Sequence, residues 1–341
     1  MKQYSEVITA ARSVIGEKCR ACPICDGRGC RDRIPGPGSK GVGDTAIRNY
    51  DKWRNIRVNM DTLNARANTD PSLSIFGRTF ALPFFAGPVG AVAAHYSDAY
   101  DDLRYNEVLL RGCANKGIAA FTGDGINPKV VESAAEALKG VNGMGVPTIK
   151  PWNLETIQGK MDLIKDSGCF AVAMDIDAAG LPFLRGITPP AGSKSVAEMK
   201  EIIAMTDLPF IIKGVMTAKG AEKSLEAGAS AIIVSNHGGR VLDQCPATAE
   251  VLPEIVEAVK GTGMKILVDG GIRSGVDIFK ALALGADGVL IARPFVTAVY
   301  GGGVEGVELL IDKYAAELID TMEMCGAAAL RDITRDMVSI F

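Results

Sequence analysis

The stretch KILVDGGIRSGVDIFKALALGADGVLIARP, residues 265–294, decides the fold class of this chain. It opens with the apolar run KILVDG (265–270), continues through a segment of helical composition, GVDIFKALALG (275–285), and closes with a second apolar run, GVLIAR (288–293). A short run that is apolar throughout is typical of a parallel strand buried on both faces. Glycine is the usual residue at the end of a helix. The stretch therefore predicts a strand–helix–strand unit.

The same pattern repeats along the chain from about residue 80 onward. The other apolar runs are LPFFAG (82–87), IAAFTG (118–123), VPTIKPW (146–152), AVAMDI (171–176), PFIIKG (209–214) and AIIVSN (231–236). With the two runs above they make eight strand–helix units, which predict an α/β protein of the (β/α)8 TIM barrel type. A doubly wound open sheet is the alternative. The number of runs, and the lack of a G-x-G-x-x-G motif after the first run, favour the barrel.

Composition excludes several classes of protein. The 341 residues carry 37 Lys+Arg and 40 Asp+Glu, a formal net charge of −3, and 48% are hydrophobic. A disordered chain would be less hydrophobic, and a nucleic-acid-binding protein would be more basic. No apolar run reaches the roughly 18 residues of a membrane span, and the N-terminus lacks the apolar core of a signal peptide. We therefore expect a cytoplasmic protein whose partners are neither nucleic acids nor membranes.

Two regions of the chain differ in character. Residues 1–78 contain four of the eight cysteines, the Pro/Gly-rich stretch IPGPGSKGVG (34–43) and one helical segment near the start. Residues 79–341 contain the repeating strand–helix units. The expected organisation is an N-terminal extension that is Cys-rich and helical, followed by the barrel.

Polar residues follow the predicted strands at the end where TIM barrels form active sites. Lys150 and Lys213 come directly after apolar runs, and a buried ammonium group needs an anionic or acceptor partner. Asp175 and Asp177 end another run. The sequence therefore predicts a charged site at the carboxyl ends of the strands.

Any imidazole chemistry must use one of two histidines. His237 directly follows a predicted strand and precedes Arg240, whose guanidinium group suits a bidentate contact with a carboxylate. His95 lies farther along the loop after the first strand, so His237 is the better-placed candidate.

The loop DGGIRSG (269–275) and Arg293 predict a phosphate site. Glycines let backbone N–H groups approach a ligand, and the N-terminus of the following helix favours an anion. Loops after the seventh and eighth strands are the usual phosphate site of a TIM barrel. We expect the phosphate of a substrate or cofactor at this position.

Three segments carry a resemblance to a known family: FIIKGVMTAKGAEKSLEAGA (210–229), SNHGGRVLD (235–243) and LVDGGIRSGVDIFKALALGADGVLIARP (267–294). They resemble the FMN-dependent 2-hydroxy-acid oxidases and dehydrogenases, which include glycolate oxidase, lactate oxidase and mandelate dehydrogenase. The resemblance is near-continuous over 205–340 and traceable back to about residue 40. It implies an FMN-dependent oxidoreductase that transfers a hydride from the α-carbon of a 2-hydroxy acid to flavin N5.

The resemblance also implies roles for individual residues. His237 matches the base that takes the hydroxyl proton, and Asp177 matches its partner carboxylate. Arg240 matches the arginine that binds the substrate carboxylate, and Lys213 matches the cation near flavin N1. The residues expected around the rest of FMN are Ala86, Gly87, Pro88, Thr122, Lys150, Asp175, Ser235, Asp269, Gly270, Gly271, Arg273, Ala292 and Arg293.

The chain departs from the family's pattern on the substrate side. CPICDGRGCRDRIPGPG (22–38) stands where the family has Tyr-Tyr-x-x-Gly, KPW (150–152) replaces Gln-x-Tyr, and DID (175–177) replaces Thr-Val-Asp. The loop GDGINP (123–128) replaces one that carries a tryptophan. The substrate is thus a small-molecule carboxylate of unspecified size. Its expected contacts are Trp152, Arg185, His237 and Arg240.

Cys19, Cys22, Cys25 and Cys30 have the spacing C-x2-C-x2-C-x4-C. Four thiolates at such spacing can bind zinc or a [4Fe–4S] cluster. A regulatory disulfide, four reduced thiols and a pocket lid in place of the family's tyrosine are the alternatives.

Two other functions stay open on the sequence alone. One is a non-catalytic or electron-carrying flavoprotein whose cysteine cluster senses redox state or metal. The other is an FMN barrel of different chemistry, such as an isomerase. The presence of the proposed base and its partners favours the enzyme, because a flavin carrier does not need a base. The resemblance further implies a homo-oligomer, a tetramer.

Overall fold

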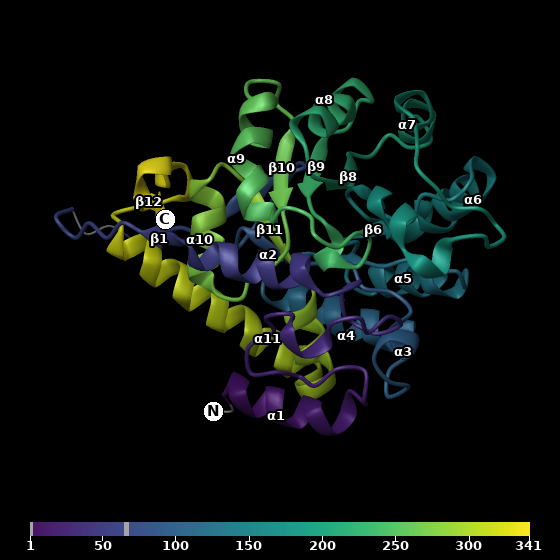
Figure 1. Ribbon diagram of the computed structural model, residues 1–341, viewed down its shortest axis with the longest axis horizontal. Helices are drawn as coiled ribbons and strands as arrows, with labels where there is room; N and C mark the ends of the chain where they lie inside the picture. The colour runs from purple at the N-terminus through teal and green to yellow at the C-terminus, as the bar shows by residue number, and fades with distance from the viewer. Residues whose placement is uncertain (1–2, 65–67) are drawn as a thin grey trace.

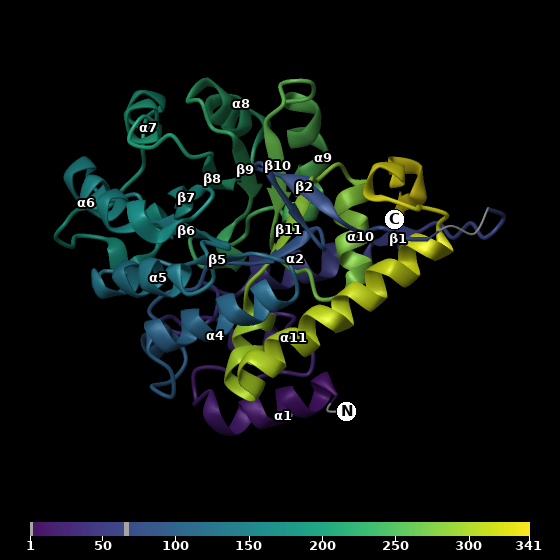
Figure 2. The same cartoon turned by 180° about the vertical axis from the view of Figure 1, so that it is seen from behind.

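A closed barrel of eight parallel strands forms the centre of the computed structural model, which describes residues 3–64 and 68–341 (Figures 1 and 2). The barrel strands are β4 (Phe84–Ala86), β5 (Ala120–Thr122), β6 (Gly145–Ile149), β7 (Val172–Asp175), β8 (Phe210–Val215), β9 (Ala231–Val234), β10 (Lys265–Val268) and β11 (Gly288–Ile291). The last strand pairs with the first, with Val289 opposite Phe84. The barrel prediction is therefore confirmed, and the open sheet is excluded.

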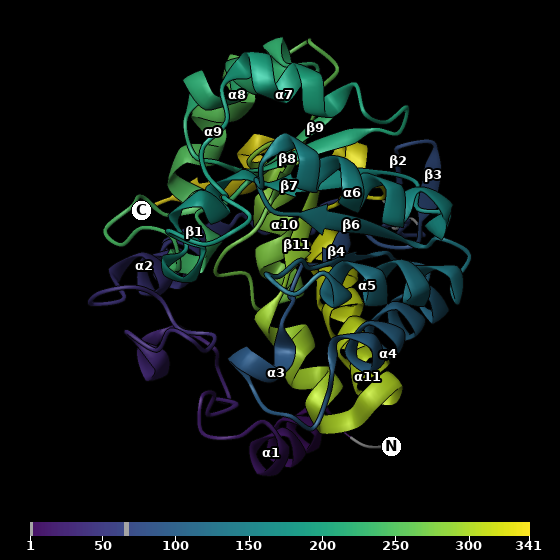
Figure 3. The same cartoon turned by 90° about the vertical axis from the view of Figure 1, so that its right-hand side faces the viewer.

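Helices follow the strands and cover the outside of the barrel (Figure 3). They are α3 (Val92–His95), α4 (Asp102–Asn115), α5 (Lys129–Lys139), α6 (Leu154–Ile164), α7 (Val196–Ile203), α8 (Ala218–Glu226), α9 (Thr248–Ala258), α10 (Gly275–Ala283) and α11 (Arg293–Met324). The side chains of Asn153, Ser195, Thr217 and Ser274 accept hydrogen bonds from the first turns of α6, α7, α8 and α10. Each such cap stabilises its helix by about 1 kcal/mol.

A small hairpin closes the amino-terminal end of the barrel. Its strands are β2 (Leu73–Ile75) and β3 (Arg78–Phe80). The ring of Phe80 lies 5.0 Å from that of Phe85 in β4 and 5.5 Å from that of Phe170, which precedes β7. Because aromatic side chains fill this end, the open end of the barrel is the one at which the strands terminate.

The first helix, α1 (Tyr4–Val14), lies against α11 (Figures 1 and 2). Gly301 of α11 makes this packing possible, because a Cβ atom there would lie 2.0 Å from the carbonyl oxygen of Val7. The contact holds the N-terminal segment beside the barrel. Among the helices of the described residues, none has both the length and the apolar character of a membrane span.

The N-terminal extension contains more structure than the single helix expected from the sequence. A second helix, α2 (Asp44–Arg54), follows the Pro/Gly-rich stretch, and a short 3-10 turn, η1 (Arg28–Cys30), lies within the cysteine segment. Strand β1 (Ile56–Val58) pairs with β12 (Val338–Ile340), which joins the extension to the C-terminus. Helix α2 was not expected from the hydrophobic pattern, because polar residues such as Asn49 are buried on its inner face.

Candidate active site

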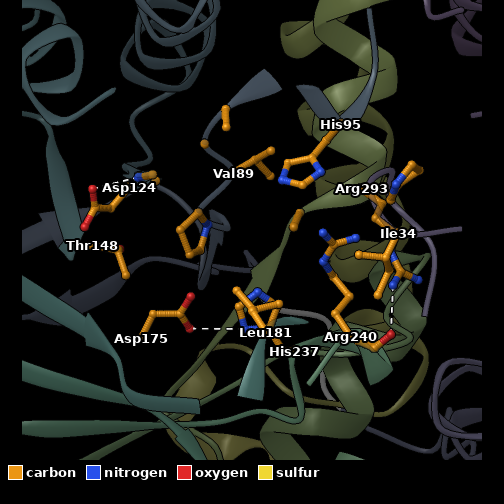
Figure 4. A pocket seen from close by; sticks show the side chains of 18 of the residues that line it. Ile34, Val89, His95, Asp124, Thr148, Asp175, Leu181, His237, Arg240 and Arg293 are labelled. Atoms are coloured by element: carbon orange, nitrogen blue, oxygen red, sulfur yellow. Dashed lines mark hydrogen bonds and ion pairs between the residues drawn. The ribbon is translucent and has the colours of Figure 1, made fainter. Parts of the chain in front are cut away.

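A cavity of about 680 Å³ opens at the carboxyl ends of the barrel strands (Figure 4). Its volume falls within the roughly 300–1,000 Å³ typical of small-molecule sites. The predicted site residues that line it are Pro88, Lys150, Asp175, Lys213, His237, Arg240, Asp269, Gly270, Gly271, Arg273, Ala292 and Arg293. The barrel thus brings residues from the ends of many different strands to one cavity.

The other predicted site residues lie outside this lining. They are Ala86, Gly87, Thr122, Trp152, Asp177, Arg185 and Ser235. Thr122 is fully buried at the end of β5, and the hydroxyl of Ser235 accepts a hydrogen bond from the backbone N–H of His237 at 3.1 Å. Arg185 is exposed and is not among the residues that line the cavity, so its contact with the substrate stays a prediction.

One ring nitrogen of His237 faces two carboxylates. The residue begins the turn η5 (His237–Gly239) directly after β9, with φ of +55°, a conformation uncommon outside glycine. Its Nδ1 is 3.0 Å from Asp177 Oδ1 and 3.4 Å from Asp175 Oδ1 (Figure 4 shows the pair with Asp175). Because Nδ1 faces carboxylate oxygens, it carries the proton of the neutral ring, and Nε2 is the nitrogen that can accept one.

The two carboxylates make His237 a stronger base. Burial alone lowers the pKa of His237, but Asp175 and Asp177 more than offset burial, so the pKa is raised above 6.5. Burial raises the pKa of Asp177, whereas His237 and Lys213 hold the pKa of Asp175 well below its usual range despite burial. Asp175 is therefore an anion, and its charge favours the protonated imidazole.

Lys213 places a permanent positive charge at the same end of the cavity. Its Nζ is 2.8 Å from Asp175 Oδ1 and 3.8 Å from Asp269 Oδ2. Burial opposes the charge, but the surrounding aspartates raise the pKa of Lys213 above its usual value. Lys150 adds a second ammonium group, 3.8 Å from Asp175 Oδ2. The lysines that follow the apolar runs thus have the anionic partners that their burial requires.

Arg240 and His95 form the side of the cavity that faces the N-terminal segment. Arg240 donates hydrogen bonds from Nη1 to the carbonyl oxygens of Gly36 and Gly38, and burial lowers its pKa to about 10. The backbone N–H of Gly36 donates to His95 Nδ1 at 3.3 Å. Burial and the nearby Arg240 and Lys150 lower the pKa of His95 to about 3, so this imidazole is neutral.

Asp124 is a site residue that the sequence reasoning missed. Its carboxylate is buried and accepts hydrogen bonds from four donors: the N–H groups of Gly125 and Lys150, the indole of Trp152 and the ammonium of Lys160. Trp152 is consequently buried and is not among the residues that line the cavity, which leaves its expected contact with the substrate a prediction. Asp124 could have been noticed in the sequence as an acidic residue between two glycines in the loop GDGINP (123–128).

The glycine-rich loop after β10 and the start of α11 form the part of the cavity that lies next to the cysteine segment. Gly270 and Gly271 have φ of +92° and +80°, and a Cβ atom at Gly271 would lie 2.1 Å from the carbonyl oxygen of Asn49 in α2. Arg273 donates to the carbonyl oxygen of Cys25 at 2.7 Å, and Arg293 donates to that of Gly238 at 2.9 Å. Two guanidinium groups therefore border one end of the cavity.

Comparison with known proteins identifies the family. The family described as FMN-dependent dehydrogenase matches residues 37–183 and 188–340. The chain belongs to this family. The match confirms the resemblance seen in the sequence. The matched region begins at residue 37, so the four cysteines of the N-terminal segment lie outside it.

Similar proteins oxidise 2-hydroxy acids, according to their names. A peroxisomal (S)-2-hydroxyacid oxidase of Arabidopsis thaliana is 46% identical over 146 residues, which are 43% of this chain and 40% of that protein. The match to a glycolate oxidase of Oryza sativa is 37% identical and covers 70% of this chain and 61% of that protein. A 4-hydroxymandelate oxidase of Amycolatopsis orientalis is 29% identical, and the match covers 89% of this chain and 94% of that protein.

Solved structures of a mandelate oxidase have the same fold. One, a variant with 2-hydroxy-phenylacetamide, has a TM-score of 0.80 at 26% identity and covers 99% of this chain and 98% of that chain. Another, a variant with (S)-mandelic acid, has a TM-score of 0.80 at 27% identity with the same coverage.

The cavity residues of this family member fit FMN. Within the described chain, the buried oxygens Thr148 Oγ1 and Asp269 Oδ1 have no hydrogen-bond partner, although both residues line the cavity. A bound ligand with polar ring atoms would satisfy such groups. Arg273 and Arg293 suit a phosphate, and the fixed charge of Lys213 suits a flavin ring that becomes negative on reduction. FMN is thus supported by both the family and the site.

Proposed function

We propose that this protein oxidises a 2-hydroxy acid to the corresponding 2-oxo acid with FMN as its cofactor. The observation that carries this proposal is the pairing of His237 with Asp177 and Asp175 in a cavity that also presents Arg240 and Lys213. A protein that merely carried flavin would need the arginines and the lysine, but not a base whose ring nitrogen faces two carboxylates.

The chain's own residues supply binding and proton transfer. Arg240 binds the substrate carboxylate through its guanidinium group, which fixes the α-carbon and its hydroxyl near His237. His237 accepts the hydroxyl proton at Nε2, and Asp177 and Asp175 stabilise the imidazolium that forms. When bound, FMN supplies the acceptor for the hydride that leaves the α-carbon. The substrate thus loses one proton and one hydride, which carries two electrons. Its C–O single bond becomes the carbonyl of the 2-oxo acid.

The cofactor is proposed to lie between the two charged ends of the cavity. Gly270, Gly271, Arg273 and Arg293 would hold its phosphate, because the loop glycines let backbone atoms approach closely and the guanidinium groups supply positive charge. Lys213 would stabilise negative charge on the ring.

The substrate is proposed to carry an apolar side chain. Ile34, Leu181 and Phe183 line the cavity together with His237 and Arg240. Figure 4 labels Ile34 and Leu181 among the side chains that line this cavity with His237 and Arg240. An apolar substituent would gain roughly 25 cal/mol for each Å² that it removes from water against these side chains.

The cytoplasmic location and the tetramer remain predictions.

Anaerobic mixing of the FMN-loaded protein with a panel of 2-hydroxy acids tests the proposed activity. The panel runs from glycolate through lactate to longer aliphatic and aromatic acids, and the loss of oxidised-flavin absorbance is followed. The expected result is bleaching that is fastest with an apolar side chain. If dithionite bleaches the flavin but no acid in the panel does, the proposed function is wrong.

A further inference from the structure

The four cysteines of the N-terminal segment lie around a second cavity. Cys19, Cys22, Cys25 and Cys30 all line it, and all four are partly buried and free of disulfides. The family match begins at residue 37, so the reaction common to the family does not account for this cluster.

The second cavity adjoins the arginine end of the active-site cavity. Pro37, Tyr96 and Arg293 line both cavities. Arg273 links them as well: its Nε donates to the carbonyl oxygen of Cys25 at 2.7 Å, and its Nη2 lies 3.7 Å from Cys25 Sγ. An N–H group directed at a cysteine sulfur, with guanidinium groups nearby, stabilises a thiolate and is one of the interactions that tune iron–sulfur clusters.

The separation of the sulfur atoms argues against zinc. A tetrahedral zinc ion with Zn–S bonds of about 2.3 Å holds its sulfurs roughly 3.8 Å apart. In the described chain, the one group of three potential ligand atoms within 4.8 Å of one another is Asp175, Asp177 and His237, and no three cysteines form such a group. Sulfurs that surround a shared cavity without converging on one point suit a larger, multi-iron centre.

The spacing and local backbone agree with that geometry. The C-x2-C-x2-C run of Cys19, Cys22 and Cys25 is a ligand spacing of bacterial iron–sulfur proteins. Ala21, between the first two cysteines, has φ of +41°, which turns the chain sharply. Gly29 leaves space beside the cluster, since a Cβ atom there would lie only 3.2 Å from Cys22 Sγ.

We propose that Cys19, Cys22, Cys25 and Cys30 bind a [4Fe–4S] cluster beside the arginine end of the active site. Each thiol loses its proton to solvent as its sulfur bonds to an iron, so binding involves no change of oxidation state in the protein. The cluster with its four thiolates is an anion, and Arg273 and Arg293 offset its charge. Because Cys25 contacts Arg273, the cluster also fixes one of the guanidinium groups assigned to the FMN phosphate, a consequence that rests on the proposed cofactor site.

Elemental analysis of anaerobically purified full-length protein tests the proposal independently of catalysis. Iron, zinc, acid-labile sulfide and FMN are measured per chain, before and after reconstitution with iron and sulfide. We expect about four irons and about four sulfides per chain. After dithionite reduction we expect an EPR signal from the cluster, which fully reduced FMN does not give.

Matched serine variants assign the ligands. Cys25→Ser should lose most of the iron and sulfide and should release FMN several-fold more readily, because Arg273 loses its sulfur contact. Cys245→Ser is the control, since Cys245 is partly exposed and lies outside both cavities. It should keep iron, sulfide and FMN at wild-type levels. Cys30→Ser provides a second ligand variant if Cys25→Ser does not fold.

Each of the following results would contradict the proposed [4Fe–4S] cluster. One zinc per chain without sulfide would show a structural zinc site instead. Four titratable thiols and no metal after reconstitution would leave ordinary cysteines. Retention of iron by both ligand variants would place the metal elsewhere. Because metal and sulfide are counted without substrate, a failure of the proposed oxidation leaves this test unaffected, and the reverse also holds.

Discussion

The two ends of the active-site cavity are built in different ways. At the reaction end, which comprises Asp175, Asp177, Lys213 and His237, the charged groups pair with one another, and all come from the ends of barrel strands or the turns directly after them. At the arginine end, which comprises Arg273 and Arg293, the guanidinium groups donate to backbone carbonyl oxygens, one of them in the N-terminal segment.

This difference distinguishes contacts made among barrel residues from contacts between the barrel and the N-terminal extension. The side chains of the reaction end are positioned by the ends of the barrel strands. The turn that carries His237 also contacts the extension, because the side chain of Asn236 is hydrogen-bonded to Asn49 of α2. At the arginine end, Arg273 contacts Cys25, which precedes the barrel, whereas Arg293 contacts Gly238 within the barrel. We therefore expect substitutions at the reaction end to affect chemistry, and substitutions at the arginine end to affect cofactor retention.

The largest effect is expected at the reaction end. His237→Ala should keep FMN bound but reduce it with substrate about 10²–10⁴-fold more slowly, because the general base is lost. Anaerobic stopped-flow absorbance gives the rate, and the flavin content after desalting serves as the control. A variant that reduces FMN as fast as the wild type would move the base elsewhere, and His95 is the other imidazole in the sequence.

At the arginine end, Arg293→Leu should raise the Kd for FMN roughly 10–100-fold, because one charge-assisted hydrogen bond to a phosphate contributes about 1.5–3 kcal/mol. The rate of flavin reduction at saturating FMN should change much less. Flavin fluorescence on titration measures the Kd. Arg293→Lys keeps the charge but not the planar fork, so it should lie between the wild type and Arg293→Leu. Wild-type affinity in Arg293→Leu would contradict the assigned phosphate site.

A smaller effect concerns the pH dependence of the reaction end. Only unprotonated His237 can accept a proton, so wild-type kcat/KM should fall as the pH drops through its raised pKa, above 6.5. Asp175→Asn removes a charge that stabilises the imidazolium, so the acid limb should move to lower pH by roughly one unit. The profile of kcat/KM against pH measures the shift. A limb that stays in place or moves upward would remove Asp175 from this role.

The smallest effect on catalysis is expected beneath the cavity. Trp152→Phe should leave KM within about twofold of the wild-type value, because the indole is buried against Asp124. It should lower the free energy of unfolding by about 1.5–3 kcal/mol, the usual contribution of a hydrogen bond to a charged group. Denaturant unfolding and steady-state kinetics separate the two quantities. A large rise in KM with unchanged stability would return Trp152 to the substrate site.

The barrel and most of the reaction end could be predicted from the amino-acid sequence. Strands buried on both faces must be apolar throughout, so each run was visible without any knowledge of its neighbours. Since parallel strands of a barrel all end at one rim, a polar residue directly after a run, such as Lys213 or His237, must lie near the site.

Which polar groups contact one another could be seen only in the folded structure. Asp124 pairs with Lys160, 36 residues away, and Arg273 reaches Cys25, 248 residues away. Neither of these pairs can be predicted from a periodic pattern in the sequence, because the contacts depend on how the segments around the barrel pack once it has closed. The same holds for Trp152, which follows a strand as His237 does but turns into the core, since Asp124 offers its indole a buried acceptor.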